Sequence, residues 1–342
     1  STLMTHNMTT ANLSYFKEGE MERYNKEFDS YCKNSFYRTI CDFRSLLNRI
    51  QQTSNILFKN SFVIPHIVRD VKNKFLHNTI PLRSLEIAVE YNCNSACEQC
   101  SCRLDYQPGK PRLSMQEFKN AVDQAIELGA FQFCITGGEP LLQLNDVCEL
   151  VAYIRSKKCY VHLCSNGLLI TREVLEKLAK LGLNSLEMGL DSVEPETHDD
   201  NRREGGFQKI MQNTEWAKEL NMLVIWNTVC TSEKIDNYDL LALIKLARKK
   251  GALLQITPPC VTGAWKNREE ILLNDRGQKY FWWLMSFPNV RTDMYSSLTA
   301  VRCPAAREKI GLQPYGDVVS CPLIQIKYGN VNNESLASIS QK

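Results

Sequence analysis

The fold of this chain is decided by the stretch Val89-Glu90-Tyr91-Asn92-Cys93-Asn94-Ser95-Ala96-Cys97-Glu98-Gln99-Cys100-Ser101-Cys102, which follows a strand-like run at 85–89. Its first three cysteines have the spacing Cys-x3-Cys-x2-Cys. Three thiolates at this spacing suit three irons of a four-iron cluster and leave the fourth iron open to another ligand. Structural zinc usually takes four protein ligands. The spacing alone therefore leaves a cluster, a partial zinc site and coincidence as alternatives.

A second stretch, Phe133-Cys134-Ile135-Thr136-Gly137-Gly138-Glu139-Pro140, follows one helix-length segment later. A strand ends there in two glycines, where the backbone can approach a ligand closely. Glu139 then sits at the carboxyl end of the strand, where ligands bind in α/β folds. Taken alone, the stretch is equally compatible with a tight turn from a strand into a helix.

In this order and at this separation, the two stretches resemble the radical S-adenosylmethionine (radical SAM) superfamily. The resemblance implies that Cys93, Cys97 and Cys100 hold a [4Fe-4S] cluster whose open iron binds S-adenosylmethionine (SAM). It also implies that the segment Gly137-Gly138-Glu139 receives the ammonium group of the methionine part. One electron from the cluster would cleave SAM to methionine and a 5′-deoxyadenosyl radical, and this radical would abstract a hydrogen from a C–H bond of the substrate.

Residues 82–258 alternate strand-like runs with helical runs. Such repeats predict a parallel sheet with right-handed crossovers. The resemblance implies an α/β fold with a partial (β/α)6 TIM-like barrel, since a full barrel of eight repeats would need more chain. We expect a helical extension at 1–80, the barrel at 81–258 and a small region of β-hairpin and helix at 259–342. The expected strands are 85–90, 131–135, 160–164, 184–190, 222–230 and 252–257, and the expected helices are 114–129, 143–157, 171–181, 204–220 and 237–250.

Polar residues at the expected carboxyl ends of later strands extend the resemblance. In the superfamily, residues at such positions contact the ribose, the methionine carboxylate or the sulfonium side of SAM. Hydroxyl, amide and carboxylate groups suit ribose hydroxyls, and a guanidinium suits a carboxylate. Each of these residues is equally suited to a turn. The candidates are Ser165, Asn166, Asp191, Arg202 and Asn227.

One position departs from the superfamily pattern. An aromatic residue often precedes the third cysteine of the motif, near the adenine, whereas this chain has Gln99 there. We therefore expect the adenine contact to be polar or to come from elsewhere. Cys102 lies two residues beyond the motif, and we interpret it as a spare thiol of the core rather than a ligand.

Residues 259–342 contain Cys303 and Cys321 on either side of an expected β-hairpin at 311–317. The pattern Cys-x12-Gly-x4-Cys resembles the start of the SPASM/twitch extension of radical SAM enzymes. That extension implies an auxiliary [4Fe-4S] cluster with Cys303 and Cys321 among its ligands. The later cysteines of a complete extension do not appear in this sequence. Cys260 is either a third ligand or a catalytic thiol that faces the substrate.

The composition sets the remaining expectations. The net charge of +3 gives no strong footprint for nucleic acid, no apolar run is long enough to cross a membrane, and no secretion signal opens the chain. With fourteen cysteines and no such signal, metal binding and reduced thiols are favoured over disulfides, and we expect the protein in the cytoplasm. In the extension at 1–80, Ile40, Phe43, Leu46, Leu47 and Ile50 recur at helical spacing, as do Ile64, Ile67, Val68, Val71 and Phe75. We expect this apolar stripe to pack on the barrel; contact with a partner protein or a lipid surface is the alternative.

The function implied by these features is radical chemistry on a peptide or a small natural product, with electrons from a donor such as flavodoxin or ferredoxin. An auxiliary cluster that accepts an electron would favour dehydrogenation or a cross-link. A thiol at Cys260 or Cys230 that donates hydrogen would favour epimerisation instead. The third alternative is a non-catalytic protein that binds a cluster and transfers electrons.

Overall fold

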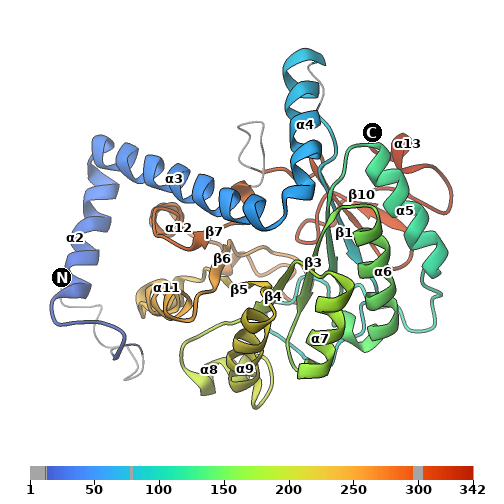
Figure 1. The fold of residues 1–342 in the computed structure, drawn as a ribbon. Coiled ribbons are helices and arrows are strands. Elements are labelled where there is room, and N and C mark those ends of the chain that lie inside the picture. Colours follow the sequence, from blue (N-terminus) through green and yellow to red (C-terminus); the bar gives the residue numbers. More distant parts are fainter. Residues whose placement is uncertain (1–11, 13, 78–79, 296–302, 342) are drawn as a thin grey trace.

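A single ten-stranded sheet forms the centre of the protein (Figure 1). The computed structural model describes residues 12, 14–77, 80–295 and 303–341. The strand order is β10-β9-β8-β1-β2-β3-β4-β5-β6-β7. Strands β8 and β1 to β7 are parallel, and β9 and β10 continue the β8 edge in antiparallel pairing. The strands are β1 Ser84–Ala88, β2 Gln132–Thr136, β3 Tyr160–Ser165, β4 Ser185–Gly189, β5 Leu223–Val229, β6 Leu253–Thr257, β7 Val290–Arg291, β8 Lys309–Leu312, β9 Asp317–Val319 and β10 Lys327–Asn330.

Helices connect the parallel strands along the outside of the curved sheet (Figure 1). The first of them begins with a capping box, in which Ser114 and Glu117 satisfy each other's free backbone N–H groups. Residue Gly182 ends α7 in the left-handed conformation that favours glycine. The helices are α2 Glu20–Lys33, α3 Ser35–Lys59, α4 Ile64–His77, α5 Met115–Glu127, α6 Leu144–Ser156, α7 Arg172–Leu181, α8 Pro195–Asn201, α9 Gly206–Glu219, α10 Ser232–Asp236, α11 Asp239–Lys250, α12 Asp275–Leu284 and α13 Leu336–Ile339.

The predicted partial barrel is confirmed. Strands β1 to β6 and the five helices expected between them lie within two residues of their predicted bounds. The sequence did not predict the short helices α8 and α10, or β7. It also did not predict that β8 pairs in parallel with β1, so the C-terminal hairpin of β8 and β9 continues the barrel sheet.

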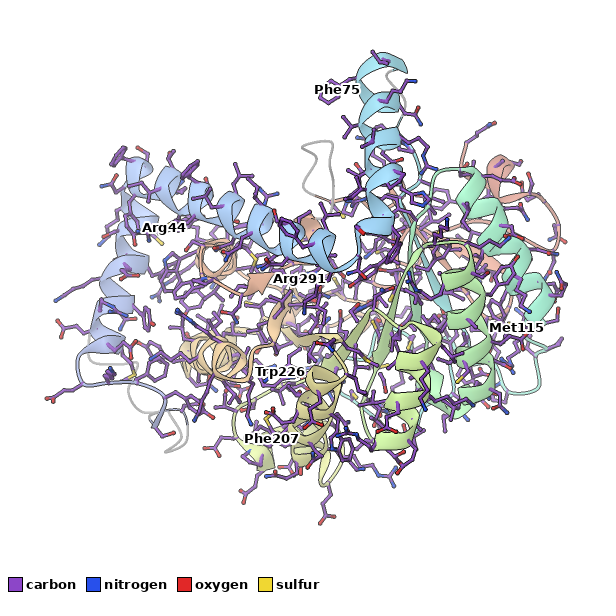
Figure 2. All side chains as sticks on the ribbon, in the orientation of Figure 1. Arg44, Phe75, Met115, Phe207, Trp226 and Arg291 are labelled. Atoms are coloured by element: carbon purple, nitrogen blue, oxygen red, sulfur yellow. The ribbon has the colours of Figure 1, made fainter. Side chains whose placement is uncertain are left out.

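The two faces of the sheet differ in polarity. The outer face packs under the helices: Phe133 and Ile135 of β2 are buried, and Trp226 of β5 donates a hydrogen bond from Nε1 to Thr214 of α9 at 3.0 Å (Figure 2). Side chains alternate along a strand, so the intervening residues point into the barrel lumen. These include Glu86, Cys134, His162, Glu187 and Gln255, which give the barrel a polar interior.

Charged side chains link β8 and β7, the two outermost parallel strands of the sheet. Lys309 of β8 forms an ion pair with Glu86 of β1, and its Nζ lies 3.5 Å from the carboxylate of Asp293, just after β7. Burial would lower the pKa of Lys309, but the charges of Asp293 and Glu86 outweigh it and raise that pKa. No backbone pairing joins β7 to β8 among the residues that the structure describes. The contact between Lys309 and Asp293, whose side chain is 39% exposed, spans the opening of the barrel instead.

Helices α2 and α3 attach to the β7 side of the molecule, whereas α4 lies near β1 and α5 (Figure 1) and contacts Gly129 and Phe131 before β2. Tyr24 and Phe28 of α2 pack on Trp283 of α12. In α3, the side chain of Asn48 donates hydrogen bonds to the backbone after α12. None of the described helices combines the length and the apolar character that a membrane crossing requires.

The apolar stripe of these helices does not pack as we expected. Phe43 is 59% exposed and Val68 61%. Phe75, which is labelled in Figure 2, is 77% exposed. The contacts of α3 with the rest of the protein run through other positions, such as Cys41 and Asn48. The helical period was predicted correctly, but the face that meets the barrel is the more polar one. The apolar face remains exposed at Leu46, Leu47, Ile50, Ile64 and Val71 as well.

The Lys309 ion pair yields a stability prediction. Lys309→Met leaves Glu86, whose side chain is only 12% exposed, without the cation that it pairs with, and we expect the free energy of unfolding to fall by about 3–5 kcal/mol. The matched control is Lys327→Met, which breaks the pair with Asp317, in which the lysine is 53% exposed, and should cost less than about 1 kcal/mol. Anaerobic urea denaturation measures both. Equal losses in the two variants would show that the Lys309 pair does not support the barrel.

Candidate active site

The loop 89–102 is fastened to the end of β2 by backbone contacts. The N–H of Gly138 donates to the carbonyl oxygen of Glu90 at 2.7 Å, and the N–H of Glu139 donates to that of Asn92 at 2.9 Å. A Cβ atom on Gly137 would lie 2.1 Å from the Glu90 oxygen, and one on Gly138 would lie 2.3 Å from the Asn92 oxygen. Gly137 also has a φ of +147°. Both positions therefore require glycine, because the loop packs directly against them.

The thiols of Cys93, Cys97 and Cys100 lie together in this loop, close enough for their charges to interact. Burial raises the pKa of Cys97, but the positive charge of Arg202 opposes that rise. A hydrogen bond from the thiol of Cys102 lowers the pKa of Cys100 to about 6. The thiol of Cys102 also lies 3.3 Å from the carbonyl oxygen of Gly137. The loop thus gathers three thiols and favours the thiolate form of at least one of them.

The carboxylate of Glu139 is fully buried and binds the end of β3. Its Oε1 accepts hydrogen bonds from the Ser165 hydroxyl at 2.9 Å and the Leu141 N–H at 3.0 Å, and its Oε2 accepts from the Asn166 N–H at 2.7 Å. The Asn166 amide in turn donates to Oδ1 of Asn94 at 2.7 Å and lies 3.9 Å from Sγ of Cys93. In this structure Glu139 positions Ser165 and Asn166 against the cysteine loop.

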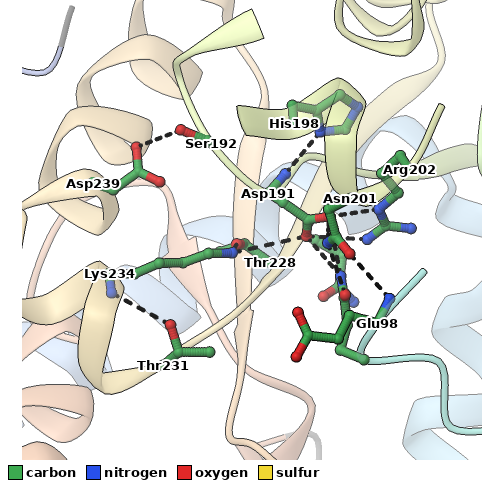
Figure 3. A network of polar contacts seen from close by, with 12 residues as sticks. Glu98, Asp191, Ser192, His198, Asn201, Arg202, Thr228, Thr231, Lys234 and Asp239 are labelled. Atoms are coloured by element: carbon green, nitrogen blue, oxygen red, sulfur yellow. Dashed lines mark hydrogen bonds and ion pairs between the residues drawn. The ribbon is translucent and has the colours of Figure 1, made fainter. Parts of the chain in front are cut away.

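Asp191 is the centre of a buried polar network at the end of β4 (Figure 3). Its carboxylate accepts from Nε of Arg202 at 2.7 Å, from the Asn201 amide at 2.7 Å and from the Gln99 amide at 2.9 and 3.0 Å. Burial alone would raise the pKa of Asp191, but the charges of Arg202 and Lys234 hold it well below its usual range. Asp191 therefore stays ionised and joins the cysteine loop to β4.

The same network extends to β5 and α8 (Figure 3). Nζ of Lys234 donates to the hydroxyl of Thr228 at 2.8 Å and lies 3.8 Å from Asp191. The backbone N–H of Asp191 donates to Nδ1 of His198 at 3.1 Å. This contact requires an unprotonated Nδ1, and burial lowers the pKa of His198 to about 4. His198 is thus neutral at pH 7.

Asn227 faces the barrel lumen. Its amide donates to Oε1 of Glu187 at 2.7 Å, and its Oδ1 accepts from the hydroxyl of Thr257 at 3.3 Å. Asn227 is therefore held by neighbouring strands, and these contacts do not include the polar network around Asp191.

The cysteines of the C-terminal region come near the end of β6. Burial raises the pKa of Cys260, and the charges of Cys321 and Cys303 add to that rise, so each of these two thiols lies within range of the Cys260 thiol. Cys303 is exposed and Cys321 is buried. Cys230, by contrast, has no exposed surface, and burial raises the pKa of its thiol to about 12.

Three members of the Asp191 network were missed as site residues by the sequence reasoning. Gln99 was noted only as a departure from the superfamily pattern, yet its amide binds both oxygens of Asp191. Asn201 directly precedes Arg202 and could have been found by that adjacency. Lys234 lies on the short helix α10, and nothing in the local sequence marks it.

The donor set fits an iron–sulfur cluster. Three thiols of one loop lie beside a buried guanidinium, and thiolates are the usual protein ligands of such clusters. Asn166 and Asp191 contact the loop from β3 and β4, and together with Gln99 of the loop they offer amide and carboxylate groups of the kind that bind a ribose or an amino acid.

Comparison with known proteins agrees with this geometry. Residues 89–251 match the Radical SAM superfamily. The chain is 25% identical over 284 residues to the PqqA peptide cyclase of Rhizobium meliloti. The aligned region covers 77% of this chain and 75% of that protein. It is 31% identical over 253 residues to the mycofactocin maturase MftC of Mycolicibacterium smegmatis. The aligned region covers 68% of this chain and 62% of MftC.

This chain belongs to the radical SAM superfamily. The predictions that it is an enzyme and that SAM and a [4Fe-4S] cluster are its cofactors follow from that membership. Among solved structures, Streptococcus suis SuiB bound to the precursor peptide SuiA superposes with a TM-score of 0.61 at 16% identity, covering 81% of this chain and 68% of SuiB. That similarity establishes the fold. The chain thus spans between three fifths and three quarters of the length of these relatives.

The buried His198 makes the stability of this radical SAM protein depend on pH. Its folded pKa of about 4 lies below the ordinary value of about 6.5, so the unfolded chain binds the proton more readily. The contribution of neutral His198 to the free energy of unfolding is therefore fully present above about pH 6.5, and about 3 kcal/mol of it is lost as the pH drops to about 4. His198→Asn keeps an acceptor for the Asp191 N–H without titrating. Urea denaturation at several pH values should give a flatter profile for the variant between pH 6.5 and 4; parallel profiles would assign the pH dependence to other groups.

Proposed function

We propose that this protein is a radical SAM maturase that modifies a peptide. The observation that carries the proposal is that the loop with Cys93, Cys97 and Cys100 is hydrogen-bonded through its backbone to the residues that follow β2, with Cys97 beside the Asp191–Arg202 pair. When bound, the cluster and SAM supply a 5′-deoxyadenosyl radical, which abstracts a hydrogen atom from the substrate.

In this proposal the chain's own residues bind and orient the cofactors. Cys93, Cys97 and Cys100 hold the cluster. The backbone of the segment Gly137-Gly138-Glu139 receives the methionine ammonium group, while the buried carboxylate of Glu139 keeps the end of β3 in place. Ser165, Asn166, Asp191, Arg202 and Asn227 remain the candidates for contacts with SAM, and among them Asn166 and Arg202 have the strongest support because both lie beside cluster cysteines.

A peptide substrate is supported by the relatives. One is named a PqqA peptide cyclase, and the solved SuiB structure contains a precursor peptide. A small natural product is the alternative substrate class.

The three thiols near β6 support an auxiliary [4Fe-4S] cluster that assists the reaction. The charges of Cys303 and Cys321 both act on the thiol of Cys260, as expected if the three are ligands of one cluster. A cluster that accepts an electron from the substrate radical favours dehydrogenation or a cross-link. Epimerisation with Cys260 as the hydrogen donor is the second candidate. Cys230 is a poor donor because it is fully buried in the apolar core.

Two partners belong to the proposal. An electron donor such as flavodoxin or ferredoxin would reduce the cluster. The exposed apolar side chains of α3 and α4 support contact with a partner protein or a lipid surface, and sedimentation with anionic liposomes separates these two alternatives.

The radical chemistry is tested by anaerobic reconstitution, followed by an assay for 5′-deoxyadenosine with dithionite and SAM. We expect the wild type to produce it and Cys97→Ala to lose both product and about four irons per chain. Cys148→Ala is the matched control, since Cys148 is a buried thiol on α6 outside the site. A wild type that binds iron but never cleaves SAM, with or without peptide, would instead support a non-catalytic protein.

The auxiliary cluster is tested by single alanine variants of Cys260, Cys303 and Cys321. Each should lower the iron content by about four atoms per chain and leave SAM cleavage intact. Cys159→Ala, which changes a buried thiol under the helices, should leave iron unchanged. If Cys260→Ala keeps all iron but loses product, Cys260 is a hydrogen donor and the ligand assignment is wrong.

A further inference from the structure

A second group of metal-ligating side chains lies inside the barrel, apart from both sets of cysteines discussed above. Cys134 of β2 and His162 and Cys164 of β3 point into the lumen, and Cys134 is directly opposite His162 in the strand register. The two Sγ atoms are 3.4 Å apart, and Sγ of Cys164 lies 3.4 Å from Nε2 of His162. All three ligand atoms lie within 4.8 Å of one another.

These separations are close to those of a tetrahedral zinc site. Zinc–sulfur bonds of about 2.3 Å and zinc–nitrogen bonds of about 2.0 Å at tetrahedral angles place two sulfurs about 3.8 Å apart, and a sulfur and a nitrogen about 3.6 Å apart. The thiols need to move apart by only a few tenths of an ångström to accept the ion. Thiolate and imidazole together are also the ligand types that zinc prefers.

The candidate for a fourth ligand is the carboxylate of Glu187 on β4. It lies outside the 4.8 Å group formed by the other three ligand atoms, so it would have to turn toward the thiols to complete the site. Oε2 of Glu187 lies 3.1 Å from Nε2 of His162. Among the residues that the structure describes, this carboxylate has no lysine or arginine within ion-pair distance. Its other contacts are the amides of Asn227 and Gln255, which orient the carboxylate without neutralising it. A largely buried carboxylate of this kind is stabilised by a nearby cation.

The second ring nitrogen of His162, Nδ1, has a hydrogen-bonding partner, as is usual for a histidine that binds a metal through its other nitrogen. Nδ1 of His162 lies 2.6 Å from the hydroxyl of Ser185. A histidine that binds zinc through one nitrogen usually donates the N–H of the other to such a group, which fixes its tautomer and ring orientation. The side chains of His162 and Glu187 remain 15% and 11% exposed, so the cluster is not sealed from the outside.

We propose that Cys134, His162, Cys164 and Glu187 bind one zinc ion in the barrel lumen. The site is closed by four protein ligands, which is the pattern of structural zinc. It ties together β2, β3 and β4 from the inside. Replacement of two thiol protons by one divalent ion leaves the net charge of the lumen unchanged, so the ion needs no further counter-charge.

The zinc site is tested on the full chain with its iron–sulfur clusters reconstituted, so that the other cysteines are occupied. After incubation with zinc sulfate and gel filtration, we expect about one zinc per chain in the wild type. The double variant Cys134→Ser/Cys164→Ser should lose it. Cys148→Ser/Cys159→Ser, which changes two buried thiols that do not face the lumen, should retain it.

Zinc-edge X-ray absorption on the wild type provides the second measurement, and it does not depend on any variant folding. The expected environment is two sulfurs at about 2.3 Å and two nitrogen or oxygen atoms at about 2.0–2.1 Å. A wild type that retains no more zinc than the Cys134/Cys164 double variant would overturn the proposal. So would three or four sulfur ligands, since that set would place the ion at the cluster cysteines.

Discussion

The close backbone contact between the cysteine loop and the end of β2 is the constraint on which the site depends. The loop 89–102 has no helix or strand of its own, so it takes its shape from what it touches. Two glycines allow carbonyl oxygens of the loop to approach within hydrogen-bonding distance of the Gly138 and Glu139 N–H groups. Any side chain at Gly137 or Gly138 would push the three thiols away from the polar groups at the strand ends. The two glycines therefore serve to let the backbone of the cysteine loop pack against the residues that follow β2.

A buried charge network completes this arrangement from the other side. Asp191 receives hydrogen bonds from the loop through Gln99, from the end of α8 through Asn201, and from Arg202, which directly follows α8. Burial of both Asp191 and Arg202 is tolerated because each neutralises the other and because amides satisfy the remaining oxygen lone pairs. The guanidinium is therefore fixed next to Cys97 and Cys100. The ion pair with Asp191 sets the position of the Arg202 guanidinium.

Much of this architecture could be predicted from the sequence because it depends on local pattern. The spacing of the cysteines, the paired glycines and the alternation of strands with helices are all visible within short windows. Gln99 and Lys234 could not be recognised as partners of Asp191, because their role arises only when β4, β5 and the loop converge. The direction of the N-terminal apolar stripe was likewise predicted wrongly, since periodicity locates an apolar face without saying what covers it. Asn227 has a partner in Glu187 that only the strand register reveals.

The pairing of β8 with β1 has a consequence for how the chain is synthesised. Ser84 pairs with Lys309, which emerges from the ribosome 225 residues later. Until then β1 has one unpaired edge, and an open strand edge invites pairing with other chains. Contacts between such distant residues also form slowly. The early helices and the six-strand core can fold during translation, whereas protection of the edge beside the cysteine loop must wait for the end of the barrel to be made.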